Sequence, residues 1–493
     1  MSYDPLAIRR EIGHPVIDSD SHYTEFMPVL RDQLIETVGD IAGAEMRERI
    51  AAPNDLRSYL LSYTSPIGQA FGAGTWAKET PEERQANWTP VPGWGPPHAH
   101  ALDRATALIP KLRAERLEEI GIDFAVLYPS SALIFPHIEE AELRQVICRA
   151  MNVINAGAYK HVSERMTPSA AIPMMNPDEA IAELDFAIGE LGLKVAMFGS
   201  VARPIRAIHK DHPELYKSVF RIDSLGIDSE HDYDPFWKRC EELKVPLVSH
   251  GGNAAVGWRR SPTNYIFNQT GCFADAGEVL CRSLFLGGVT RRFPSLKFQF
   301  LECGAGWATT LYSELVHRWE KRNRKAIEEL LEGARASADE FLRLLDEHGD
   351  AALRGHLEDM PHAIQMQLGM AIPPDDFAAC EIESVEDIEA LFVDRFYFGC
   401  EADDPSAAWA FNGEVNPGGV QLRALLGSDM GHWDVPDMRG ILPEAYELVE
   451  NGQMSREDFR HFLFDFPYEF FAGVNPDFFK GTTVESYARE TAQ

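Results

Sequence analysis

The 493-residue sequence is poor in basic residues, since 46 Lys and Arg face 77 Asp and Glu and leave a formal charge of −31 at pH 7. Nucleic-acid binding needs clustered Lys and Arg, and an anionic membrane repels such a chain, so we expect neither partner. No run reaches the ~18 apolar residues of a membrane span, and residues 1–13 lack the apolar core of a signal peptide. Seven scattered cysteines without a CxxC pair favour reduced thiols. We therefore expect a soluble, acidic, cytoplasmic protein.

Eight short runs of apolar and β-branched residues predict buried strands. Most are continuously apolar, which is typical of a parallel sheet covered on both faces. The runs are 15–22, 123–130, 167–175, 193–199, 245–251, 296–303, 395–401 and 424–432. Helical patterns lie between them, at 139–161, 177–191 and 234–243. This alternation favours an α/β fold, a single (β/α)8 TIM barrel, over two doubly wound domains.

Three insertions account for the surplus length, at about 26–110, 204–233 and 321–394. The first contains the stretch WTPVPGWGPP, which cannot form a regular helix or strand. Loops after the strands form the catalytic mouth of such a barrel. We therefore expect one domain over residues 1–493, with the insertions covering the mouth as lid or oligomer segments.

Acidic and histidine side chains follow four of the predicted strands at the point where each strand ends. In the first strand they alternate with serines, so they share one face. The residues are Asp20 and His22, then His250, then Glu302, and finally Asp429 with His432. A single acid or histidine is more often part of a hydrogen-bonded structure. Four strands of one barrel that deliver such groups to the same end predict a divalent-metal site of imidazole and carboxylate.

Several stretches resemble a known family: VIDSDSHYTE, GIDFAVLYPSS, FPSLKFQFLECGAGW, LLGSDMGHWD and FFAGVNPDFFKGT. They are similar to the amidohydrolase-related branch (amidohydrolase 2) of the metal-dependent amidohydrolases, in a long bacterial form. That branch includes aminocarboxymuconate-semialdehyde decarboxylase and γ-resorcylate decarboxylase. The resemblance implies Asp20, His22, His250 and Asp429 as metal ligands, with Asp429 alternatively a general base, and it implies a possible homodimer.

The sequence departs from the family pattern at two site positions. Many relatives have histidine where this chain has Asp20, and the decarboxylases place a catalytic histidine where it has Glu302. Binuclear hydrolases carry a bridging lysine at the end of strand four. Lys194 lies four residues before Phe198, roughly 13 Å too deep to bridge two ions.

Two chemistries stay open for these residues. In the first, one zinc or manganese ion is held by the four implied ligands, and Glu302 or His432 moves the proton. The reaction would be hydrolysis or nonoxidative decarboxylation of a small carboxylic or aromatic metabolite. In the second, the three carboxylates and three histidines hold two iron ions of a nonheme diiron monooxygenase that hydroxylates a small organic or natural-product substrate.

A third interpretation, a binding protein on an inactive barrel, is disfavoured because the set of ligands is complete. Three further residues are candidates for substrate contact. Arg203 follows the fourth strand and could pair with a substrate carboxylate. Trp307 and Trp433 follow site residues closely and could form walls of the pocket.

Overall fold

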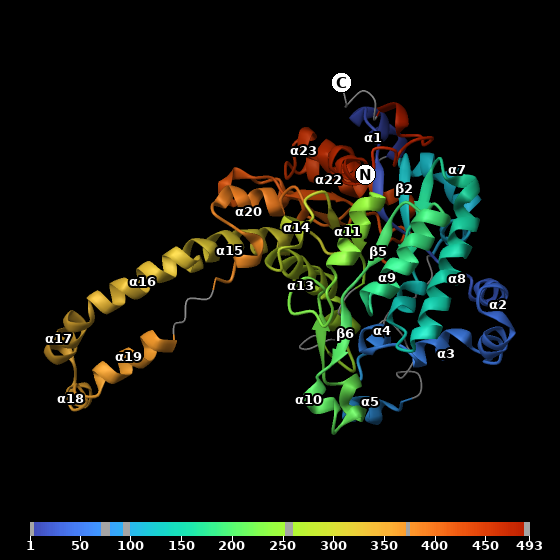
Figure 1. Ribbon diagram of the computed structural model, residues 1–493. Coiled ribbons are helices and arrows are strands. Elements are labelled where there is room, and N and C mark those ends of the chain that lie inside the picture. Colours follow the sequence, from blue (N-terminus) through green and yellow to red (C-terminus); the bar gives the residue numbers. More distant parts are fainter. Residues whose placement is uncertain (1–3, 71–78, 92–98, 252–259, 371–374, 488–493) are drawn as a thin grey trace.

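Eight parallel strands close into a barrel in the computed structural model, which describes residues 4–70, 79–91, 99–251, 260–370 and 375–487 (Figure 1). The barrel strands are β1 Ile17–Tyr23, β2 Phe124–Pro129, β3 Met166–Pro168 continued by β4 Ala170–Ala171, β5 Ala196–Phe198, β8 Leu247–Ser249, β9 Phe298–Phe300, β10 Phe396–Cys400 and β11 Arg423–Leu426. They pair in the orders β1-β2-β3 and β4-β5-β8-β9-β10-β11. A parallel bridge between Ser21 and Met430 joins the first strand to the segment after the last. The predicted (β/α)8 barrel is confirmed, and every predicted strand overlaps an observed one.

Helices surround the barrel, most of them between consecutive strands, with one before β1 and three after β11. They are α1 Pro5–Ile12, α7 Pro110–Ile120, α8 Ala141–Tyr159, α9 Pro177–Leu184, α11 Asp234–Leu243, α12 Tyr265–Gln269, α13 Cys272–Leu286, α14 Val289–Arg292, α15 Gly306–Arg322, α20 Val385–Phe392, α21 Ala407–Ala410, α22 Ile441–Glu450, α23 Arg456–Arg460 and α24 Phe466–Val474. The start of α9 shows why the sequence is helical there, since Pro177 is in its first turn and the Asn176 side chain accepts from the Glu179 amide. The three predicted helices correspond to α8, α9 and α11.

The first two insertions add structure around the barrel. The first contains α2 Met27–Ala51, α3 Leu56–Ser62, α4 Pro66–Ala70, α5 Pro81–Asn87 and α6 Ala101–Leu108. Its Val91 amide donates to the Ser261 carbonyl, so this insertion reaches the loop that follows β8. The second holds an antiparallel pair, β6 Val201–Pro204 and β7 Phe220–Asp223, with α10 Arg206–His209 between them. Part of the WTPVPGWGPP stretch, residues 92–97, lies outside the described residues.

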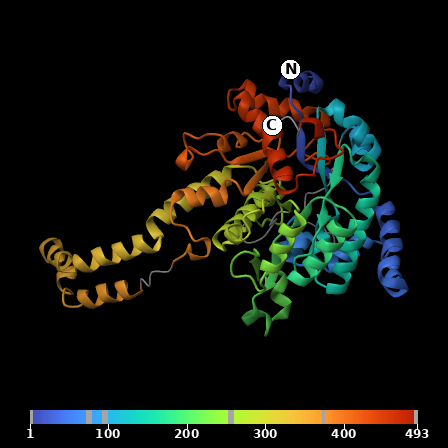
Figure 2. The same cartoon turned by 45° about the horizontal axis from the view of Figure 1, so that its top comes forward.

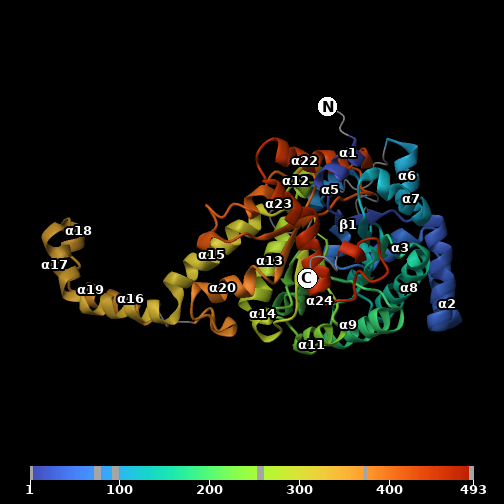
Figure 3. The same ribbon diagram turned by 90° about the horizontal axis from the view of Figure 1, so that it is seen from above.

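The third insertion forms a helical arm, which we define as Arg324–Met370. It comprises α16 Arg324–Ala336, α17 Ala338–His348, α18 Ala351–Arg354 and α19 Met360–Met370. Figures 1, 2 and 3 show the arm projecting away from the barrel. We expected the insertion to cover the mouth, but this part of it does not. Arg322 and Asp376 form an ion pair of 2.9 Å, so the chain leaves and returns at one place.

The barrel has a dense aromatic core that fixes its strands. Phe298 is fully buried, and its ring centroid lies 5.7 Å from that of Trp237 and 5.9 Å from that of Phe396. All seven cysteines are described, and none forms a disulfide. Among the described helices, none combines the length and hydropathy that crossing a membrane requires.

Candidate metal centre

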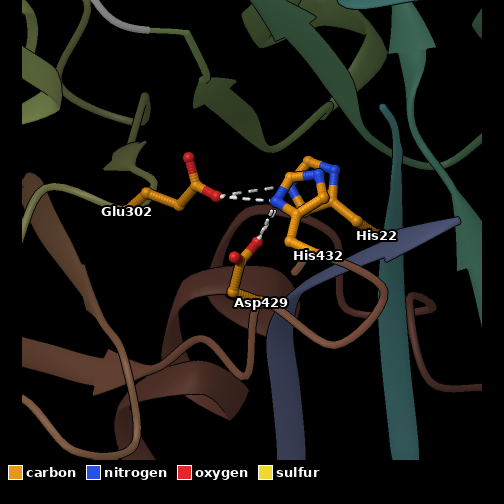
Figure 4. Close-up of side chains that lie close together, drawn as sticks. All are labelled: His22, Glu302, Asp429 and His432. Carbon is orange, nitrogen blue, oxygen red and sulfur yellow. Dashed lines mark hydrogen bonds and ion pairs between the residues drawn. The ribbon is translucent and has the colours of Figure 1, made fainter. Parts of the chain in front are cut away.

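The structure brings all six predicted ligand side chains together at one end of the barrel. Figure 4 shows four of them, His22, Glu302, Asp429 and His432. Ligand atoms of His22, Glu302, Asp429 and His432 all lie within 4.8 Å of one another, and so do those of Asp20, His22 and His250. Because His22 belongs to both groups, the six side chains surround one centre. Each is at most 5% exposed, so the centre is shielded from bulk water.

The distances at the centre are short. His22 Nε2 lies 2.7 Å from His250 Nε2 and 3.4 Å from Asp20 Oδ1. The same nitrogen is 3.7 Å from Asp429 Oδ1, and His250 Nε2 is 3.8 Å from Glu302 Oε2. Convergence of imidazole nitrogens and carboxylate oxygens on one point is what a divalent ion requires.

Backbone hydrogen bonds between β1 and the segment after β11 position three of these residues, Asp20, His22 and Asp429. The Asp429 amide donates to the Asp20 carbonyl at 3.0 Å, and the His22 amide donates to the Met430 carbonyl at 2.8 Å. Asp18 also follows the alternating pattern, but the β1 register shifts after it. Its carboxylate instead accepts from Ser428 Oγ at 2.6 Å and ties the two strands together.

Two glycines of the stretch GSDMGH allow this close approach. A Cβ at Gly427 would lie 2.7 Å from the Cβ of Asp20. Gly431 has φ +120°, and a Cβ there would lie 2.1 Å from the His22 carbonyl oxygen. Any larger residue at these positions would push the ligands of β1 out of place.

Two of the candidate ligands, Glu302 and Asp429, have an unusual backbone conformation. Glu302 and Asp429 have φ values of +53° and +50°, in the left-handed region that non-glycine residues rarely adopt. Such strain persists where the surrounding structure fixes it, and it is enriched at functional sites. Glu302 lies two positions after β9 and Asp429 three positions after β11, and the left-handed turn directs each carboxylate into the centre.

Burial keeps the histidines in their ligand form. It lowers the pKa of His22 well below its usual value and the pKa of His250 to about 4. Burial, reinforced by the charge of Glu302, raises the pKa of Asp20 well above its usual value. A neutral imidazole is the form that binds metals, so both histidines are ready to coordinate at neutral pH.

Glu302 behaves differently from the other acids. Burial by itself would raise its pKa, but the neighbouring His250, His432 and Asp429 outweigh it and hold the pKa at about 2. Among the described residues, no hydrogen bond reaches the buried atoms Glu302 Oε2 and Asp20 Oδ1. Buried carboxylate oxygens almost always have a partner, so the residues present fit a bound cation.

Three residues of this region were not identified from the sequence. Ser130 Oγ lies 3.1 Å from His432 Nε2, and Arg113 donates to the His22 carbonyl. Glu401 follows β10, where burial and then Glu302 raise its pKa to about 8. Ser130 and Glu401 end predicted strands, so the same rule of strand ends could have found them. Arg113 lies within a helix, where no sequence signal marked it.

Of the residues predicted to contact substrate, Trp307 and Trp433 lie near the centre, whereas Arg203 does not contact it. Trp307 lines a cavity of about 360 Å³ beside Glu302, and Trp433 packs against Tyr265. Arg203 lies in β6, where its guanidinium bonds to Asp223 and to the Met175 carbonyl, and none of its described contacts reaches the six residues. Lys194 donates to the Phe478 carbonyl at 2.7 Å, consistent with a position too deep to bridge.

The family model described as "Amidohydrolase" matches residues 97–330, which include His250 and Glu302. The match covers just under half of the chain, which is similar to the amidohydrolase-related family over this range. The chain is 26% identical to γ-resorcylate decarboxylase of Rhodococcus jostii over 226 residues, 45% of this chain and 63% of that protein. It is 24% identical to 2-amino-3-carboxymuconate-6-semialdehyde decarboxylase of Dictyostelium discoideum over 202 residues, 41% of this chain and 50% of that protein. Each alignment spans less than two thirds of the relative.

A solved structure supports the fold. The 5-carboxyvanillate decarboxylase from Sphingomonas paucimobilis is similar with a TM-score of 0.50 at 12% identity, and the match covers 93% of this chain and 98% of that one. At this identity the likeness concerns the fold alone. The barrel described above is therefore the architecture of that protein too.

Proposed function

We propose that this chain is a metal-dependent enzyme that carries out nonoxidative decarboxylation, or hydrolysis, of a small carboxylic or aromatic compound. The observation that carries the proposal is the meeting of six ligand-type side chains at the ends of β1, β8, β9 and β11. The two curated relatives are both named decarboxylases, which supports the carboxy-lyase form. They give no support to a diiron oxygenase.

The metal would be a single divalent ion, zinc or manganese. Asp20, His22, His250 and Asp429 would hold it, since their ligand atoms converge and their side chains are shielded from water. When bound, such an ion supplies a Lewis acid that stabilises negative charge on the substrate.

His432 is the group best placed to move a proton. Its Nδ1 lies 2.6 Å from Asp429 Oδ1 and 3.2 Å from Glu302 Oε1. Because the pKa of Glu302 is held at about 2, this acid stays ionised. It can therefore accept a hydrogen bond from the imidazole and so orient the ring. When the bond to the departing carboxyl group breaks, the electron pair stays on the substrate carbon, and we assign to His432 the proton that this carbon takes up. In a hydrolysis Asp429 would accept the proton of the attacking water.

The three insertions would cover the mouth of the barrel or form contacts between subunits. Residues 26–110 and 204–233 would act as lid segments, because the first bonds to the loop after β8. Residues 321–394 would contain oligomer contacts of a homodimer, because the helical arm projects from the barrel. The absence of disulfides among the seven described cysteines is compatible with a reducing cytoplasm.

Metal analysis combined with two variants tests the proposal. The purified protein should contain about one divalent ion per chain, and His22→Ala with His250→Ala should lower that content by at least about tenfold. Release of carbon dioxide from aromatic acids, γ-resorcylate among them, should fall with the metal. His348→Ala, in the exposed helical arm, is the matched histidine control and should retain both. Unchanged metal content in the double variant would show that the site assignment is wrong.

A further inference from the structure

Arg113 is a buried cation whose hydrogen bonds to described residues end on no carboxylate. It lies in α7, the helix before β2, and only 1% of the residue is exposed. Its partners are one hydroxyl and two carbonyl oxygens. A guanidinium keeps its charge at neutral pH, and a buried charge is costly unless its surroundings satisfy it. What this side chain contributes follows from the three atoms that it contacts.

The guanidinium bridges the seam between β1 and the segment after β11. Its Nη1 donates to Ser21 Oγ at 3.3 Å, and its Nη2 donates both to the His22 carbonyl and, at 3.3 Å, to the Met430 carbonyl. Ser21 and His22 belong to β1, whereas Met430 follows Asp429 directly. One planar group therefore holds both segments, and each of its contacts is on a candidate metal ligand or next to one.

The backbone leaves room for this group at Gly431. A Cβ on that residue would lie 3.3 Å from Arg113 Nη2 and 2.1 Å from the His22 carbonyl oxygen. The Met430 carbonyl also accepts from the His22 amide at 2.8 Å, so it joins β1, α7 and the segment after β11. Both carbonyl groups belong to fully buried residues, and loss of the guanidinium would take a donor from each of them.

Geometry and charge predict opposite effects of this arginine on metal binding. A guanidinium repels a divalent ion, so its charge alone would weaken the binding of the metal. Metal–ligand distances, in contrast, must be correct to within about 0.2 Å. His22 Nε2 lies 3.7 Å from Asp429 Oδ1 across the seam, so a small shift of one segment against the other would separate these two ligands.

We propose that Arg113 is a positioning residue of the metal centre, which holds His22 and Asp429 in register across the seam between β1 and the segment after β11. The proposal rests on the function proposed above, because that function assigns both residues to the metal. It adds a residue of α7, remote from the ends of the strands, to those on which metal binding depends.

Zinc binding by an Arg113 variant and by a matched arginine variant tests the proposal. In competition with a chelating dye, Arg113→Met should bind zinc at least about tenfold more weakly, although it lacks the repelling charge. Cobalt(II) in place of zinc should show altered visible absorption in this variant, because its bands depend on the ligand geometry. Arg116→Met removes the other buried guanidinium of α7, which bonds to Asp103 at 2.7 Å, and should change neither readout.

The variant Arg113→Lys separates the fork of donors from the charge. Lysine keeps the positive charge but offers one nitrogen in place of the planar fork, so zinc should bind at least about threefold more weakly. Its control is Arg116→Lys, which should bind zinc as the wild type does. If Arg113→Met does not fold, this pair of lysine variants decides.

Amide hydrogen exchange tests the same contact in the metal-free protein. Peptides that cover residues 17–23 and 427–433 should exchange at least about tenfold faster in the Arg113 variants than in the wild type. The Arg116 variants should show the exchange of the wild type in these peptides.

The outcomes separate this proposal from the function on which it rests. Zinc affinity that is unchanged or higher in the Arg113 variants overturns it, and so does an equal loss of affinity in the Arg116 variants. A wild-type protein that binds neither zinc nor manganese contradicts the proposed function. Hydrogen exchange then decides on Arg113: faster exchange in its variants alone supports the positioning of the seam, and equal exchange overturns it.

Discussion

The barrel and the helical arm are held by different forces. In the barrel, strands of only three to seven residues carry site side chains that are almost fully buried. In the arm, α17 has 11 residues and buries none of them, while Leu330 and Phe341 are 68% and 48% exposed. Figure 3 shows how little of the arm touches the rest of the molecule. Tertiary burial therefore determines the barrel, whereas local helix formation determines the arm.

Helix caps and neighbouring ion pairs explain how the arm forms. The Asn323 side chain accepts from the Ala326 amide at the start of α16, and Asp350 caps α18 in the same way. Arg343 pairs with Glu347 four residues away and with Glu340 three residues away. These contacts are exposed and local, so we expect substitutions in the arm to have small effects.

The largest difference in stability between the barrel and the arm should come from replacing one phenylalanine in each of them. Phe298→Ala removes a fully buried ring of the barrel and should lower the free energy of unfolding by about 4 kcal/mol. Phe341→Ala in the arm should lower it by less than about 1 kcal/mol. Thermal and urea unfolding of both variants measures this. Equal losses would mean that Phe341 is covered in solution.

A buried ion pair of the barrel and an exposed ion pair of the arm should also differ in how much they stabilise the protein. Arg144 and Glu179 bond at 2.5 Å and 2.7 Å with side chains only 3% and 2% exposed. Glu179→Ala leaves the guanidinium buried without its partner and should destabilise the protein by about 3 kcal/mol. Glu340→Ala breaks the exposed pair with Arg343 and should leave the unfolding midpoint unchanged. A similar shift in both variants would contradict the distinction.

Acid should weaken the barrel through His137. Burial lowers its pKa in the folded protein from 6.5 to about 4, so the unfolded chain binds more protons between these values. Its contribution is fully present above pH 6.5 and is lost as the pH falls towards 4, by about 2 kcal/mol at pH 5 relative to pH 8. Unfolding measured against pH should show a shallower acid slope for His137→Gln. A slope that does not change would exclude this residue as a source of acid sensitivity.

Removal of the helical arm should have the smallest effect. Because Arg322 and Asp376 are in contact, a short Gly-Ser linker from residue 323 to residue 375 can replace the segment between them. Metal content should be unchanged and kcat/KM should stay within about twofold, since the arm projects away from the barrel. Loss of metal from the shortened protein would show that the arm supports the centre.

The sequence predicts the barrel well for a physical reason. Strands that are buried on both faces must be apolar throughout, so eight runs were visible without knowledge of the pairing. The pair β6 and β7 was missed, because strands such as Phe220–Asp223 are only partly buried and carry charged residues. The direction of the helices in the third insertion depends on contacts that periodicity does not report.

The six centre residues were predictable because polar side chains after buried strands are conspicuous. The conformation and charge state of these residues could not be predicted in the same way. Asp18 follows the same alternation as Asp20, yet an irregularity in β1 turns it towards Ser428. The left-handed conformations of Glu302 and Asp429 and the low pKa of Glu302 arise from neighbours distant in sequence. Such properties depend on the closed barrel, so only the structure shows them.

The seam between β1 and the segment after β11 also has a consequence for synthesis of the protein. Asp18 and Ser428 are 410 positions apart, so the first strand leaves the ribosome long before its partner exists. At about 5–20 residues per second, the wait is roughly 20–80 s. During that time the β1 edge and its acids have no closing strand, and an unpaired strand edge makes a partly folded chain prone to aggregation. The centre can form only when nearly the whole chain has been translated.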